Sequence, residues 1–202
     1  VYSHGINGLA RTGSIPVFQQ YGPPSLPGDP FYQHFRDFFR QGTTANHSLS
    51  FSGGSDKTSF LTSASFFNNE GITYNTSFQR VTAKLSATHQ MSEKLSVGGQ
   101  INYANSKGVN PASGDKSIYS SLSYWSPSFD VNDYLKADGT QKNITAGTID
   151  NPRYMAESSP LNTDVNRVYG DMNLNYKFNS WLSARYQITA DYYNDRRSRI
   201  VP

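Results

Sequence analysis

The chain has 202 residues, a formal net charge of +3 and no cysteine. Charged residues make up 16% and aromatic residues 14% of it, which excludes a disordered chain, since such chains are rich in charge and poor in aromatic residues. The mean hydropathy of −0.62 and the lack of a long apolar run exclude a helical membrane protein. The lack of cysteine excludes disulfides, thiolate catalysis and cysteine-ligated metals.

Residues 1–45 form a lead-in rich in proline and glycine, in which five prolines interrupt any strand pattern. A short amphipathic helix is predicted near 30–41, because Asp29 can cap it, Pro30 suits its first turn and Gly42 can end it. We expect the helix to pack its phenylalanines against the rest of the fold; a helix that binds a partner protein is the alternative. The phenylalanines predicted to share its face are Phe31, Phe35, Phe38 and Phe39.

Residues 46–105 are predicted to form four strands in two hairpins. In the first hairpin, a two-residue turn at Ser55-Asp56 would place Phe51 opposite Phe60. Side chains of one strand point alternately to opposite faces, so this pairing gives the hairpin one apolar face. The apolar members are Leu49, Phe51, Phe60, Ala64 and Phe66.

The second hairpin turns at residues 90–94 and shows a cleaner alternation. Its apolar residues all have odd numbers, and pairing Leu85 with Gly99 and Val81 with Tyr103 keeps them on one face.

Residues 106–163 follow as a long loop, predicted to be extracellular, and residues 164–202 contain a third hairpin and the start of the next loop. In the third hairpin even positions are apolar and odd positions polar, on both sides of a tight turn at Asn179-Ser180.

Strand length favours a membrane barrel over a soluble sheet. Soluble strands average about 5–6 residues, whereas a tilted strand that crosses a bilayer needs roughly 9–11. The predicted strands that meet the longer requirement span 77–89, 95–105, 164–178 and 181–193. Aromatic residues lie toward their ends, as in the girdles of outer-membrane barrels. Slipping the last strand by one residue would move Arg185 into lipid, at about 2–4 kcal/mol at the midplane.

The fold class that follows is an all-β, antiparallel transmembrane β-barrel. Six strands leave two unpaired edges, which hydrocarbon does not tolerate. We therefore expect the chain to be part of a longer polypeptide that supplies the remaining strands. A small self-contained barrel, either an adhesin or an enzyme, is a weaker alternative.

Charged residues on the polar faces are predicted to point into the lumen. They either pair with one another and with a plug, or set the electric field that a passing solute meets. These lumen-facing candidates are Arg80, Lys84, Asp171, Lys177, Arg185 and Asp191.

Aromatic residues are concentrated in the long loop, among serine and proline. Exposed aromatic side chains stack on sugar rings or anchor partner proteins; alternatively, they fold the loop onto itself. These candidates for ligand or partner contact are Tyr119, Tyr124, Trp125, Phe129 and Tyr134.

No catalytic, cofactor-binding or metal-binding residue is predicted, and we do not expect an enzyme. The four histidines are dispersed, and Asp115 separates Gly114 from Lys116 where a phosphate-binding loop would need glycine next to lysine. Asp130 and Asp133 lack the spacing of a calcium loop.

Two stretches resemble a known family. Phe39-Arg40-Gln41-Gly42, followed at 46–58 by NHSLSFSGGSDKT, resembles the early barrel of the SusC-like TonB-dependent outer-membrane transporters of Bacteroidota. The run FFNNEGI at 66–72 and Phe78-Gln79-Arg80 resemble the hairpin that follows in that family. The resemblance covers about residues 31–105.

This resemblance implies a barrel of about 22 strands with a plug, located in a bacterial outer membrane and importing glycans, peptides or similar nutrients. It implies as partners the lipid bilayer, a SusD-like lipoprotein and, through a plug outside this chain, TonB. Other outer-membrane subunits join this list if the barrel is instead a structural SusC-like subunit of a larger assembly. No nucleic-acid partner is expected.

Overall fold

The computed structural model describes residues 27–114, 117–144 and 149–200, and they form one antiparallel sheet of six strands in sequential order with three short helices. The strands are β1 (Thr43–Gly54), β2 (Thr58–Glu70), β3 (Ser77–Gln90), β4 (Leu95–Asn110), β5 (Leu161–Lys177) and β6 (Ser183–Arg199). The helices are α1 (His34–Phe38), α2 (Ile118–Tyr124) and α3 (Pro152–Ser158). The predicted class, all-β and consistent with part of a barrel, is confirmed. The first part of the lead-in, residues 1–26, lies outside the described ranges.

The strands are 12 to 17 residues long, so all of them exceed the span that a bilayer requires. Several run further than predicted. β4 continues to Asn110 and β5 begins at Leu161, which shortens the long loop to 111–160. β6 continues to Arg199, past the Tyr193 at which we expected it to end.

The register of the first two hairpins differs from the prediction by two residues. Leu85 pairs with Ile101 instead of Gly99, because the turn closes where the Met91 N–H donates to Leu95 O at 2.9 Å. Phe51 pairs with Thr62 instead of Phe60. A shift of two residues keeps every side chain on its face, so the predicted apolar set, with Phe60, Ala64 and Phe66, remains together.

The Phe51 shift has a local cause. The Ser55 N–H donates to Thr58 O at 2.7 Å, and the Thr58 N–H donates back to Ser55 O at 3.3 Å. The two-residue turn is therefore Asp56-Lys57, one residue later than the predicted Ser55-Asp56.

The connection between β5 and β6 is longer than the predicted two-residue turn. The Phe178 N–H donates to Leu182 O at 3.0 Å, and Asn179 Oδ1 accepts from the Leu182 N–H at 2.9 Å, so residues 178–182 make the turn. With a two-residue turn at Asn179-Ser180, Leu174 would have faced Arg185. The longer turn pairs Leu174 with Tyr186 and keeps the apolar residues of both strands on one face.

Helix α1 is shorter than the predicted helix over 30–41. It begins after Gln33, whose side chain makes no capping hydrogen bond, so Asp29 and Pro30 precede it instead of starting it. Its phenylalanines do not share one buried face. Phe38 is 0% exposed, whereas Phe35 on the same helix is 50% exposed.

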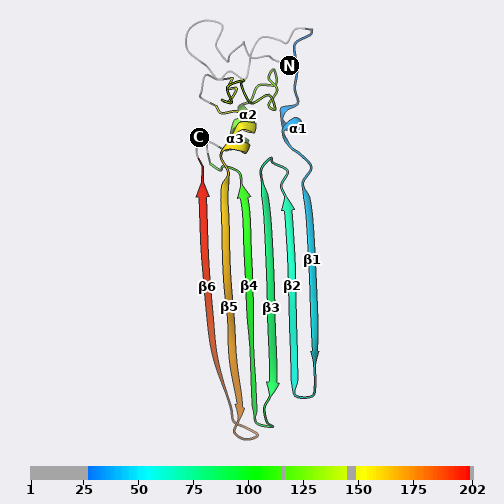
Figure 1. The fold of residues 1–202 in the computed structure, drawn as a ribbon, viewed down its shortest axis with the longest axis vertical. Helices are drawn as coiled ribbons and strands as arrows, with labels where there is room; N and C mark the ends of the chain where they lie inside the picture. The colour runs from blue at the N-terminus through cyan, green and yellow to red at the C-terminus, as the bar shows by residue number, and fades with distance from the viewer. Residues whose placement is uncertain (1–26, 115–116, 145–148, 201–202) are drawn as a thin grey trace.

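The buried core lies at one end of the sheet. Residues 27–42, 71–76 and 111–160, as far as they are described, form a layer that we call the cap, at the end opposite the three short turns (Figure 1). Within the described ranges, every buried hydrophobic side chain of the core belongs to the cap. These side chains are Phe38, Ala112, Ile118, Leu122, Trp125, Val131, Met155 and Ala156.

Candidate functional site

One face of the sheet carries a broad apolar surface. Cross-strand pairing places Leu85 beside Ile101, Gly99 beside Met172 and Met172 beside Ile188. The side chains of Leu85, Ile101, Leu174 and Ile188 are 42–58% exposed, although each is large and apolar. No described part of the chain covers this face, which we call the outward face. A contiguous apolar surface of this size is typical of a membrane or protein contact.

The opposite face is polar and carries all six predicted lumen-facing residues. Alternation along β3, β5 and β6 puts Arg80, Lys84, Asp171, Lys177, Arg185 and Asp191 on this inward face. Lys84 pairs with Asn102, which in turn pairs with Tyr169, and Tyr169 pairs with Asp191. The register therefore places a row of polar side chains across four strands.

The inward acidic residues have partners other than the predicted ones. Arg167, which sequence reasoning did not select, donates from Nε to Asp191 Oδ1 at 2.9 Å and forms an ion pair with it through Nη2. Asp171 accepts a hydrogen bond of 2.8 Å from Gln100 Nε2. Arg185 Nη2 donates to Gln187 Oε1 at 3.2 Å.

Positive charge predominates on the inward face of the described strands. Alternation assigns seven cations and three anions to it. The cations are Arg80, Lys84, Arg167, Lys177, Arg185, Arg197 and Arg199, and the anions are Asp171, Asp191 and Asp195. Ion pairs join Arg167 to Asp191 and Arg197 to Asp195, so the net positive charge resides on the other cations.

The loop aromatics divide into two groups, and the long loop folds onto itself. Trp125 is 3% exposed, and its Nε1 donates to Phe129 O at 3.1 Å. Phe129 also packs against the core of the cap. Neither ring is available for the ligand contact that we predicted, because both serve the packing of the loop. Tyr119 and Tyr124 on α2 are exposed.

Tyr134 is partly buried and lies in a cluster of arginine and tyrosine that sequence reasoning missed. The Arg153 guanidinium carbon lies 3.1 Å from the ring centroid of Tyr74 and 5.6 Å from that of Tyr134. The Arg40 guanidinium carbon lies 5.8 Å from the Tyr74 ring. Cation–π contacts of this kind depend on three separate cap segments, so local sequence patterns carry no sign of them.

The loop between β2 and β3 is bonded into the cap. Thr73 Oγ1 and Tyr119 Oη lie 3.2 Å apart, and Asn75 Nδ2 donates to Ala156 O at 3.2 Å. Asn75 adopts a positive φ of 53°, a conformation that asparagine tolerates better than most residues. The cap is thus one unit built from both connections on this end of the sheet and from the lead-in.

Within the described ranges, no group of three or more histidine, aspartate or glutamate residues is arranged to hold a metal ion. None of the helices found there is long and apolar enough to cross a membrane.

The fold is similar to that of solved structures of the RagAB peptide importer. Its "closed-closed" state has a TM-score of 0.65 and 19% sequence identity over 85% of this chain. Its "open-open" state has a TM-score of 0.65 and 22% identity over 84% of this chain. The chain spans about a fifth of the length of these structures, 20% and 19% respectively. No family model matches the chain, and the curated proteins contain no match. The likeness shows that this chain shares its fold with a segment of these structures.

Proposed function

We propose that the chain forms part of the wall of a TonB-dependent, SusC-like transporter in a bacterial outer membrane, and that it has no enzymatic activity. The observation that carries this proposal is the division of the sheet into two faces, one apolar and exposed, the other polar and charged. A barrel wall between lipid and water needs both. The likeness to the RagAB peptide importer supports the same assignment.

The difference between the two ends of the sheet supports one orientation in the membrane. Outer-membrane barrels have short periplasmic turns and longer extracellular loops. The turns after β1, β3 and β5 are short and lie at one end, while the cap lies at the other (Figure 1). We therefore orient the cap toward the cell exterior, where nutrient and a SusD-like lipoprotein would arrive.

The imported solute is proposed to be a peptide, a glycan or a similar nutrient. The exposed ring of Tyr124 on the cap suits stacking on such a solute or on the lipoprotein. Tyr119 is also exposed, but its hydroxyl bonds Thr73 and its ring stacks on Phe39, so it serves the cap. Below the cap, the net positive inward face favours passage of solutes that carry negative charge.

Uptake by cells that make the full-length protein tests this function. Cells that carry the protein should accumulate a fluorescent oligopeptide or oligosaccharide, and cells that lack it should not. Dissipating the proton gradient should abolish uptake if TonB supplies the energy. The Tyr124→Ala variant should reduce capture of the solute or the lipoprotein, while the amount of folded barrel stays the same.

A full-length protein that reaches the outer membrane, imports neither class of solute and copurifies with other envelope subunits would contradict the transport proposal. That outcome would support the structural alternative, a SusC-like barrel that serves as a scaffold in a larger assembly.

A further inference from the structure

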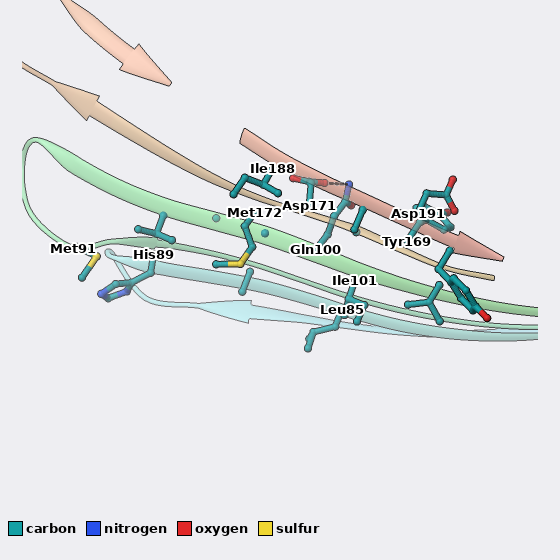
Figure 2. Close-up of a pocket in the computed structure, with 18 residues that line it drawn as sticks. Leu85, His89, Met91, Gln100, Ile101, Tyr169, Asp171, Met172, Ile188 and Asp191 are labelled. Atoms are coloured by element: carbon teal, nitrogen blue, oxygen red, sulfur yellow. Dashed lines mark hydrogen bonds between the residues drawn. The ribbon is translucent and has the colours of Figure 1, made fainter. Parts of the chain in front are cut away.

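The outward face contains a hollow among β3, β4, β5 and β6. Its volume is about 940 Å³. Large apolar side chains stand at its margins, among them Leu85, Ile101, Met172 and Ile188 (Figure 2). Its floor consists of small residues that the register brings together, namely Ala87, Gly99, Gly170 and Ala190.

Backbone packing keeps this floor open at its two glycines. A β-carbon on Gly170 would lie 2.3 Å from Gln100 O, and one on Gly99 would lie 2.8 Å from Asp171 O. Neither position accepts a side chain without movement of the adjoining strand. The hollow therefore follows from the way these strands approach one another.

Polar side chains occupy the outward face between the hollow and the cap. The hydroxyl of Tyr103 donates to Asn166 Oδ1 at 3.1 Å, and Asn105 Nδ2 donates to the same oxygen at 2.8 Å. Asn166 pairs across the sheet with Asn194. Three asparagine amides thus lie side by side directly above the apolar residues.

The next row toward the cap is positively charged. In the register of the sheet, Lys107 on β4 and Arg196 on β6 lie opposite Asp164 on β5, one on each side. Lys107 Nζ lies 3.9 Å from Asp164 Oδ2. Two cations flank a single carboxylate, so this row carries a net positive charge that complements an anionic group.

The floor of the hollow begins about half a bilayer below the charged row. Ala190 lies six positions before Arg196 along β6, which is about 20 Å at the rise of a strand. A strand tilt of 35–45° reduces this to about 15 Å along the membrane normal, half of the roughly 30 Å hydrocarbon core.

We propose that this surface binds one phosphorylated, acylated glycolipid of the outer leaflet, of the lipid A type. The acyl chains fill the hollow, the sugar lies against the asparagine amides, and a phosphate lies against Arg196 and Lys107. A zwitterionic phospholipid offers the acyl chains but neither the net negative charge nor the sugar. The inference rests on the proposed placement in an outer membrane with the cap outside.

Native mass spectrometry of the full-length protein in detergent tests the site. The protein is incubated with lipid A, with lipid A stripped of phosphate, or with phosphatidylcholine. We expect one lipid A to be retained and the other two to be lost. Arg196→Gln should weaken retention about tenfold, a loss of about 1.4 kcal/mol, because it removes a charged hydrogen-bond donor to the phosphate. Ala190→Leu should do the same by filling the floor, whereas Ala83→Leu, on the same face outside the hollow, should have no effect.

Three results would overturn the inference. Equal retention of all three lipids, or unchanged retention in both variants, would show an ordinary shell of membrane lipid. A dimer that Ala190→Leu disrupts would show that the hollow receives a second copy of the protein. A protein that does not enter lipid vesicles at all would overturn the membrane placement, and with it the proposed function; a protein that inserts but binds without selectivity would overturn only the glycolipid site.

Discussion

The sheet and the cap use apolar side chains in opposite ways. In the cap, Phe38, Ile118 and Leu122 are buried against one another and make a core of the kind found in soluble proteins. In the sheet, Leu85 and Ile188 are exposed, and the strands are joined by the backbone hydrogen bonds of the ladder. One chain thus contains a region that buries apolar area within itself and a region whose apolar area needs an outside partner.

This difference predicts that the two regions respond to different perturbations. The cap should be sensitive to cavities, because its stability comes from close packing. The sheet should be sensitive to charge on its outward face and tolerant of charge on its inward face.

The largest effect is expected in the core of the cap. Phe38→Ala should destabilise the cap by about 3–5 kcal/mol, because it leaves a cavity among buried neighbours. Hydrogen exchange should show faster exchange in α2 and α3 and unchanged exchange in β3 and β4. Phe35→Ala on the same helix is the matched control and should have little effect, because Phe35 is half exposed. Equal effects of the two variants would refute the assignment of this core.

A slightly smaller effect is expected on the sheet. Leu85→Arg should cost about 2–4 kcal/mol if the side chain lies near the midplane of the bilayer. Ser86→Arg, one residue further on the inward face, should cost little. Urea unfolding of the full-length protein in lipid vesicles compares the two. If Ser86→Arg is the more damaging variant, the two faces have been assigned the wrong way round.

Removing the side chain that caps the start of α3 should destabilise the cap by about 1 kcal/mol. Asn151 Oδ1 accepts hydrogen bonds from the Arg153 N–H at 2.8 Å and the Tyr154 N–H at 3.2 Å. Asn151→Ala removes this acceptor and with it both hydrogen bonds, and the amides of α3 should then exchange faster. Asn151→Ser, which can still cap, should restore most of the protection; failure to do so would mean that the asparagine acts through packing alone.

The smallest effect is a dependence of cap stability on pH. Burial lowers the pKa of His34 below its ordinary value of about 6.5, although a hydrogen bond to the Tyr32 backbone and the charge of Asp37 oppose this. His34 Nδ1 is buried and has no hydrogen-bond partner among the described residues. The folded cap therefore favours the neutral ring.

Cap stability should fall as the pH falls. Below about pH 6.5 His34 binds a proton in the unfolded chain more readily than in the folded cap, so protonation favours unfolding. Hydrogen exchange of the cap, corrected for the intrinsic rate, should be faster at about pH 5.5 than at about pH 7.5. His34→Gln should remove the difference, and persistence of the difference in that variant would assign it to another group.

The faces of the sheet could be predicted from the sequence, because period-two alternation depends only on the geometry of one strand. The registers were wrong by two residues, since the closing hydrogen bonds of the turns at Asp56-Lys57 and Met91 depend on atomic detail. The extension of β6 to Arg199 was missed because both faces of the strand are polar there, so no apolar alternation marks it.

The cap could not be predicted as a unit. Its core joins the lead-in, the loop after β2 and the long loop, which are far apart in sequence and short of regular structure. Trp125 illustrates the problem: among serine and proline it has the sequence context of an exposed loop residue, yet it is almost fully buried. The arginine and tyrosine cluster around Tyr74 has no local signature for the same reason.

The odd number of residues in the turn 178–182 has a consequence for how this chain tolerates insertions and deletions. Losing one residue there would exchange the two sides of β6, so that Arg185 and Asp191 would join the apolar face while Ile188 joined the polar face. Losing two residues would leave every side chain of β6 on its own face and would shift the strand only along its axis. The length of this turn can therefore change by two residues without exchanging the two faces of β6, but it cannot change by one.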